Sequence, residues 1–223
     1  MKTVPESRKQ ICVTAGVSGI LGIVMLIVSF NINPGPPAGA NLNQLIAFGE
    51  RYYDSILWGA WLQAVAPVFI TLFAFSLVHL SGAANRLSGW MVFFALVVLM
   101  AVSLIEITFY IAVMFKSPPE GILISMNTIY AVQHLYFIVA APAVFITLGV
   151  MLLNSGVLSK IFAYAAIVLG FAFAALGVFF LTTLVLPLWV TACGGAQAIW
   201  WLAASISLIK RAGEISAQSI QST

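Results

Sequence analysis

The chain of 223 residues is 62% hydrophobic and 7% charged, with a mean hydropathy of +1.11. Water-soluble domains carry about 25% charged residues, so this composition excludes a soluble globule. The net charge of +3 comes from a few scattered basic residues, which excludes the clustered basic surface of a nucleic-acid-binding protein. No polar block is long enough to fold by itself, so residues 1–223 are expected to form a single transmembrane domain.

Six apolar runs are each long enough to cross about 30 Å of hydrocarbon as a helix. They predict an all-α integral membrane protein, a bundle of six transmembrane helices. The first run is longer than the apolar core of a signal peptide, so we interpret it as a retained span. Glycines at Gly16, Gly19 and Gly22 in span one, and at Gly170 and Gly177 in span five, predict close helix contacts. The predicted spans are residues 11–30, 55–80, 89–115, 124–153, 160–185 and 188–209.

The connections and prolines add local detail. Residues 33–37 contain two adjacent prolines and cannot be helical. From Asn41 onwards the apolar residues recur at helical spacing, which predicts a short helix lying at the membrane surface. Pro67 in span two and Pro142 in span four are expected to kink their helices. The segment after Arg211 is rich in Ser and Gln, so we expect a frayed end.

The basic residues predict the topology. If the N-terminus is cytoplasmic, seven of the nine basic residues face the cytoplasm and two, Arg51 and Lys116, face the other side. This bias predicts six spans with the N- and C-termini in the cytoplasm. The short loops and the charge bias are typical of a plasma membrane protein, and of the bacterial inner membrane in particular.

Glu106 is the most informative residue, because it lies deep inside the apolar run of span three. An acid at the centre of a spanning helix costs roughly 2.5–3.5 kcal/mol, so it should face protein or water and have a partner. His134 is the best candidate partner, because it lies about ten residues into span four, at a depth close to that of Glu106. His79 lies at the cytoplasmic end of span two and is interpreted as an interface histidine.

Other spans place polar side chains at the same depth, in the outer half of the bilayer. Gln63 lies about eight residues into span two, and Gln197 about nine residues into span six. Further polar residues share the helix faces of Glu106 and His134 at spacings of three, four or seven residues. The resulting candidate ligand-binding residues are Gln63, Ser103, Glu106, Tyr110, Asn127, Tyr130, His134 and Gln197.

The sequence leaves three functions open. The favoured one is a binding or transport site for a small or lipophilic ligand, centred on Glu106 and His134, because intramembrane ionisable residues are commonly functional. A structural or accessory subunit of a larger membrane complex would instead need a directly bonded Glu–His pair, no cavity, and an exposed small-residue face on span one or five. Such a subunit would pair with another membrane protein or with a second copy of the chain.

A membrane-embedded enzyme is the third possibility, with Glu106 and His134 as catalytic acid and base on a lipid-like substrate. No motif names a reaction, so whether the chain is an enzyme stays open. One His and one Glu fall short of the ligand set of a zinc site, so no metal is expected, and no cofactor is expected either. The expected partners are the lipid bilayer and a small ligand, not nucleic acid.

Overall fold

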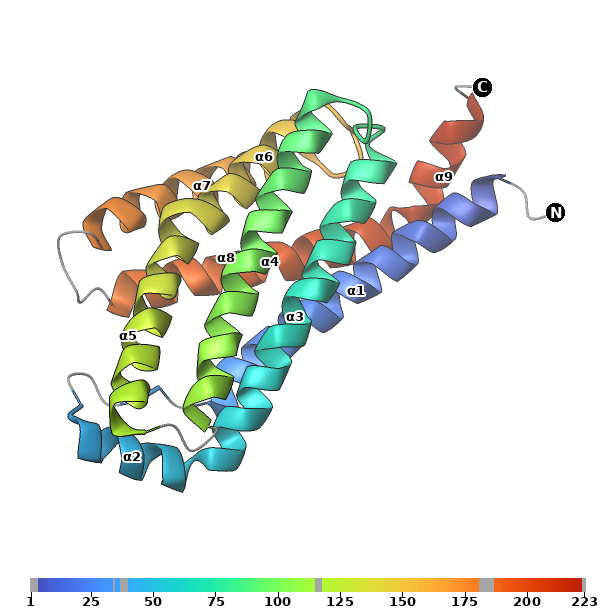
Figure 1. Ribbon diagram of the computed structural model, residues 1–223. Coiled ribbons are helices and arrows are strands. Elements are labelled where there is room, and N and C mark those ends of the chain that lie inside the picture. Colours follow the sequence, from blue (N-terminus) through green and yellow to red (C-terminus); the bar gives the residue numbers. More distant parts are fainter. Residues whose placement is uncertain (1–3, 34, 37–39, 115–117, 181–186, 222–223) are drawn as a thin grey trace.

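The computed structural model describes residues 4–33, 35–36, 40–114, 118–180 and 187–221 (Figure 1). The predicted fold class is confirmed, because six helices in this part of the chain are long and apolar enough to span a membrane. These spans are Arg8–Ile32, Tyr53–Leu80, Leu87–Met114, Gly121–Leu153, Lys160–Phe179 and Leu188–Lys210. The predicted ends of span three, at residue 115, and of span five, at residue 185, lie outside the described residues.

The helices run back and forth between two ends of the bundle (Figure 1). One end, which we call the terminal end, holds the start of α1 and the whole of α9, and the other holds α2. The elements are α1 (Val4–Ile32), α2 (Leu42–Arg51), α3 (Tyr53–Leu80), α4 (Leu87–Met114), α5 (Pro119–Leu135), η1 (Tyr136–Ala140), α6 (Ala141–Leu153), α7 (Lys160–Phe180), α8 (Pro187–Lys210) and α9 (Ala212–Gln221).

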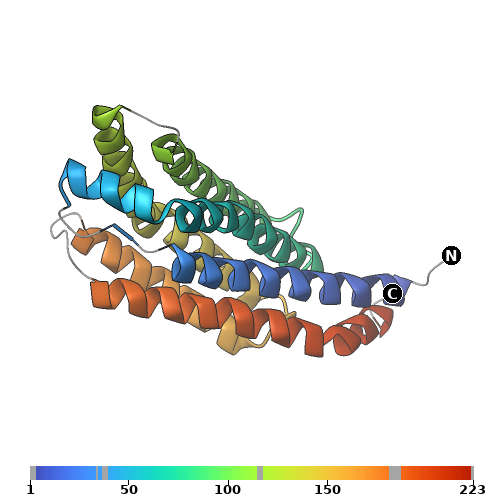
Figure 2. The same ribbon diagram turned by 90° about the horizontal axis from the view of Figure 1, so that it is seen from below.

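Helix α1 lies against α3 and alongside α8 (Figure 2). Its glycines make these contacts close. A Cβ added at Gly16 would lie 2.8 Å from the carbonyl oxygen of Ser205 in α8, and one at Gly22 would lie 3.0 Å from the carbonyl oxygen of Ala66 in α3. The Ser29 hydroxyl also donates to the carbonyl oxygen of Gly59 at 2.8 Å. The close contacts predicted for the glycines of span one are therefore confirmed, and that face is packed inside the chain.

Span five uses its glycines in the same way, against span four. A Cβ added at Gly170 would lie 3.0 Å from the backbone nitrogen of Ile146, and one at Gly177 would lie 2.8 Å from the Cα atom of Ile138. On the α6 side, Gly149 is equally close to the backbone of α7. Helices α6 and α7 thus approach each other at backbone distance, and the small-residue face of span five is also internal.

Span four is not one continuous α-helix. A single π-helical turn, η1, separates α5 from α6, and Pro142 is the second residue of α6. The span changes direction between α5 and α6 (Figure 1). Proline has no N–H to donate and its ring clashes with the carbonyl group four residues earlier, so the turn before it must widen. The sequence placed an irregularity near Pro142, and η1 lies just before it. Pro67 lies buried within α3, and its kink stays a prediction.

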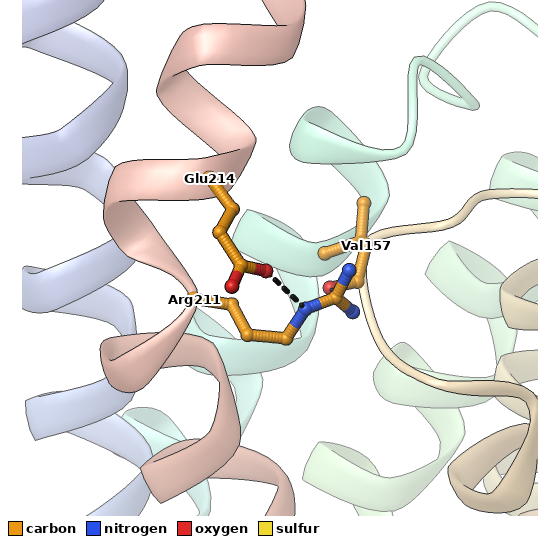
Figure 3. A network of polar contacts seen from close by, with 3 residues as sticks. All are labelled: Val157, Arg211 and Glu214. Atoms are coloured by element: carbon orange, nitrogen blue, oxygen red, sulfur yellow. Dashed lines mark hydrogen bonds and ion pairs between the residues drawn. The ribbon is translucent and has the colours of Figure 1, made fainter.

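Two arginines connect separate elements at the terminal end through hydrogen bonds to backbone carbonyl groups. The Arg8 guanidinium donates to the carbonyl oxygen of Leu80 at 2.9 Å, where α3 ends, and cations favour helix C-termini. Arg211 donates to the carbonyl oxygen of Val157 at 2.9 Å and pairs with Glu214 at 3.3 Å (Figure 3). These bonds join the start of α1 to α3, and the end of α8 to the loop before α7.

The expected frayed C-terminus is wrong, because residues 212–221 form α9, which packs against α1. Ala212, Ile215 and Ser216 are buried in that contact. The Ser- and Gln-rich composition concealed a narrow stripe of small and apolar residues at spacings of three and four. The predicted helix after Asn41 is confirmed as α2, whose first turn is closed by reciprocal side-chain bonds between Asn41 and Gln44.

Candidate functional site

Glu106 lies in the interior between α3, α4 and α5, with only 8% of its surface exposed. The amide of Gln133 in α5 donates to Glu106 Oε1 at 2.8 Å. The side chain of Gln63 in α3 also interacts with this carboxyl group. Side chains from three spans therefore contact one another at Glu106, and its two partners are neutral amides.

His134 is the wrong hydrogen-bond partner for Glu106, because the structure gives that role to the preceding residue, Gln133. The His134 ring is half-buried, and its Nδ1 atom lies 2.5 Å from the carbonyl oxygen of Tyr130, one turn earlier in α5. Successive residues of a helix point about 100° apart, and it is Gln133 that points to Glu106. The sequence identified the depth of the partner correctly but not its direction.

A second polar pair lies next to Glu106. The hydroxyl group of Tyr136, in the π-helical turn η1, donates to Oε1 of the buried Gln197 in α8. Tyr136 is also close enough to Glu106 for their charges to interact. Its ring packs edge-on against Phe173, with the ring centroids 5.9 Å apart. The wide turn therefore places a hydroxyl group between the acid and the last span.

Tyr110 extends the cluster towards the α2 end. It lies one turn after Glu106 on α4, and its hydroxyl group interacts with Gln133 and with Tyr130. Ser103 is half-buried one turn on the other side of Glu106, and Asn127 is exposed. The structure therefore brings Gln63, Glu106, Tyr110 and Gln197 into one region, which we call the Glu106 cluster, together with Gln133 and Tyr136.

Gln133 and Tyr136 were missed by sequence reasoning. The polar residues at 127, 130 and 134 suggested one face of α5, but the buried face is marked by Met126 and Ile129. Gln133 lies four residues after Ile129, and Tyr136 three residues later, so both continue that buried face. The apolar residues of the span would have been the better guide to its orientation.

A small cavity of about 30 Å³ lies between the Glu106 cluster and α2. Its walls are mainly apolar, with Leu45 and Phe48 from α2 and Ile122 and Met126 from α5, and Tyr110 belongs both to the wall and to the cluster. A cavity of this size accepts a water molecule. The acid is therefore separated from the α2 end by little more than one tyrosine and a small pocket.

The opposite side of the cluster is filled by aromatic rings. Phe73 lies ten residues beyond Gln63 along α3, roughly 15 Å nearer the terminal end. Its ring contacts Trp201, which contacts Phe145 in turn, with centroid separations of 5.9 and 5.5 Å. Phe145 also stacks on Phe173. All of these rings are buried, so packed side chains close this side of the cluster.

The chain matches no protein-family model, no curated protein and no solved structure. A carboxyl group surrounded by amides and hydroxyl groups can accept hydrogen bonds from a ligand or pair with a cation.

A double-mutant cycle tests the assigned partner of Glu106. We expect Glu106→Leu and Gln133→Leu to show a coupling of roughly 0.6 kcal/mol, and at most about 1.7 kcal/mol, as measured for other hydrogen bonds between membrane helices. The control cycle pairs Glu106→Leu with His134→Leu and should show additive effects. The measurement is the free energy of unfolding in bicelles. A larger coupling to His134 than to Gln133 would contradict the assigned contact.

Proposed function

We propose that the chain binds a small lipophilic ligand at the Glu106 cluster, as the first step of its transport across a plasma membrane. The observation that carries this proposal is a buried acid held by neutral amides, one helical turn from an apolar cavity. A carboxyl group in such a place costs stability. Groups held at a cost to the fold are characteristic of binding sites.

Three observations support a ligand site over a structural subunit. A structural role calls for a direct Glu–His bond, no cavity, and an exposed small-residue face on span one or five. The acid instead bonds to Gln133, a cavity is present beside it, and the glycines of both spans are packed inside the chain. An enzymatic role for Glu106 and His134 gains no support, because the His134 ring faces the backbone of its own helix.

The proposed orientation places the terminal end in the cytoplasm and α2 at the outer surface. Arg8 and Arg211 are bonded at the terminal end, and Arg86 lies in the short connection directly after α3. Cytoplasmic ends of membrane proteins carry such an excess of basic residues. The ligand would then reach the cluster from the outer surface or from the outer leaflet.

The site can be tested by filling the cavity. Met126 is 8% exposed and lines it, whereas Ile124 on the same helix is 64% exposed. We expect 1-octanol and octylamine, used as probes in lipid nanodiscs, to raise the Tm of the wild type in a saturable way, because ligands stabilise the state they bind. Met126→Trp should abolish the saturable rise, and Ile124→Trp should retain it.

The proposal fails if no eight-carbon probe gives a saturable shift in the wild type. It also fails if Met126→Trp and Ile124→Trp respond alike, because the shift would then come from the bilayer. Filling a packed site costs about 1–3 kcal/mol, so the Tm of each variant without probe serves as its own baseline.

A further inference from the structure

The carboxyl group of Glu106 forms no ion pair among the residues that the structure describes. Its contacts are the amides of Gln63 and Gln133, and the ion pair found in the described part of the chain joins Arg211 to Glu214 at the terminal end. Amides satisfy hydrogen bonds but do not neutralise a carboxylate. The cluster therefore offers hydrogen bonds to the carboxyl group but no cation to an ionised carboxylate.

The other ionisable groups near the acid are hydroxyl groups. Tyr110 comes from α4 and Tyr136 from η1, and both lie within electrostatic range of Glu106. Gln63 faces Glu106 from α3, and Gln197 bonds Tyr136 from α8. Among the described residues, no basic side chain forms an ion pair with Glu106. A positive charge at this position would have to come from outside the chain.

The route to this position suits a cation with an apolar body. Phe48 and Tyr110 contribute aromatic rings to the cavity, and the remaining walls are mostly aliphatic. Aromatic faces attract ammonium groups as they pass. A strongly hydrated metal ion would find few oxygen ligands along these walls, whereas an alkyl chain would be well solvated by them.

The cavity must enlarge before it holds an organic molecule, and α2 is the element that can move. Its ten residues include none that is buried, and it rests on α5 and α3 through one apolar side. Helices with few buried contacts open at low free energy. Moving α2 outward would open the cavity beside Tyr110, which lies one helical turn from Glu106.

We propose that the ligand is a lipophilic amine, with its ammonium group paired to the Glu106 carboxylate and its alkyl chain under α2. This inference rests on the proposed function and specifies its ligand. The ammonium group donates hydrogen bonds to a carboxylate, which are stronger than those between neutral groups. Gln63 and Gln133 hold the carboxylate in place for that contact.

The experiment compares octylamine, 1-octanol and octanoate, which share one alkyl length and differ in charge. In wild-type nanodiscs the apparent Kd of octylamine, from the saturable Tm shift, should be roughly 10- to 100-fold lower than that of 1-octanol. Octanoate should bind more weakly than either. Glu106→Gln should reduce the preference for octylamine to within about threefold, and Glu50→Gln, which removes an exposed acid of α2, should leave it unchanged.

The outcomes separate this inference from the proposed function. Equal binding of octylamine and 1-octanol to the wild type, abolished in both cases by Met126→Trp, overturns the amine assignment and leaves the site intact. Absence of any shift dependent on Met126 overturns the site itself. A preference for octylamine that survives Glu106→Gln overturns the pairing with the acid. The wild-type comparison decides the amine assignment even if Glu106→Gln does not fold.

Discussion

Trp201→Ala is expected to lower the free energy of unfolding by about 3 kcal/mol, the largest loss for any single truncation in this bundle. Trp201 is among the largest fully buried side chains, and its ring contacts Phe73, Phe145 and Trp200. Truncating a buried Trp or Phe costs about 3–5 kcal/mol in soluble proteins. We expect a loss of stability at the lower end of this range, because lipid solvates an indole ring better than water does. The loss then comes mainly from the packing contacts that are removed.

The control for this prediction is Trp189→Ala on the same helix. Trp189 is 60% exposed and faces the surroundings of the bundle, so its removal should change stability by less than about 0.5 kcal/mol. Both variants are measured by reversible unfolding in the same bicelles. Equal losses for Trp201→Ala and Trp189→Ala would mean that the aromatic rings do not form the packed core described here.

Gly149→Ala is expected to destabilise the bundle by about 1–3 kcal/mol, although it adds a single methyl group. That methyl group would lie 2.7 Å from the carbonyl oxygen of Ala163 and 3.0 Å from the backbone nitrogen of Ile167. Backbone atoms of a neighbouring helix cannot rotate away as a side chain can. Helices α6 and α7 must therefore separate, and overpacking of this kind costs about that amount.

The matched control, Gly194→Ala, should stabilise the bundle slightly or leave its stability unchanged. A Cβ added at Gly194 of α8 meets no atom within 4 Å, and Ala is favoured over Gly in a helix by about 0.5–1 kcal/mol. The Tm should fall for Gly149→Ala and stay level or rise for Gly194→Ala. A loss at Gly194 as large as that at Gly149 would indicate that another surface packs on α8.

The sequence predicted the spans well because membrane insertion imposes simple rules. Length and hydropathy locate each helix within a few residues, and glycines at helical spacing in α1 and α7 marked true close contacts. The helix after Asn41 was recognisable from its apolar spacing. These features depend on local composition, which the sequence displays directly.

The contacts of the candidate site were harder to predict, because they depend on how each helix is rotated about its own axis. One residue of rotation separates Gln133 from His134 and decides which of them meets Glu106. The π-helical turn, which begins at Tyr136 where this residue contacts Gln197, shifts the rotation again for the residues that follow. The sequence marks the turn only through Pro142, and it gives neither its type nor its extent.

The packing of α1 has a consequence for how the protein is made. The contact between Gly16 and Ser205 joins residues that are about 190 positions apart. At 5–20 residues per second, a ribosome needs roughly 10–40 s to cover that distance. During this interval α1 is already in the bilayer, and the part of its glycine face that belongs to α8 is open to lipid. The packing of α8 onto α1 must therefore wait until α8 has been made.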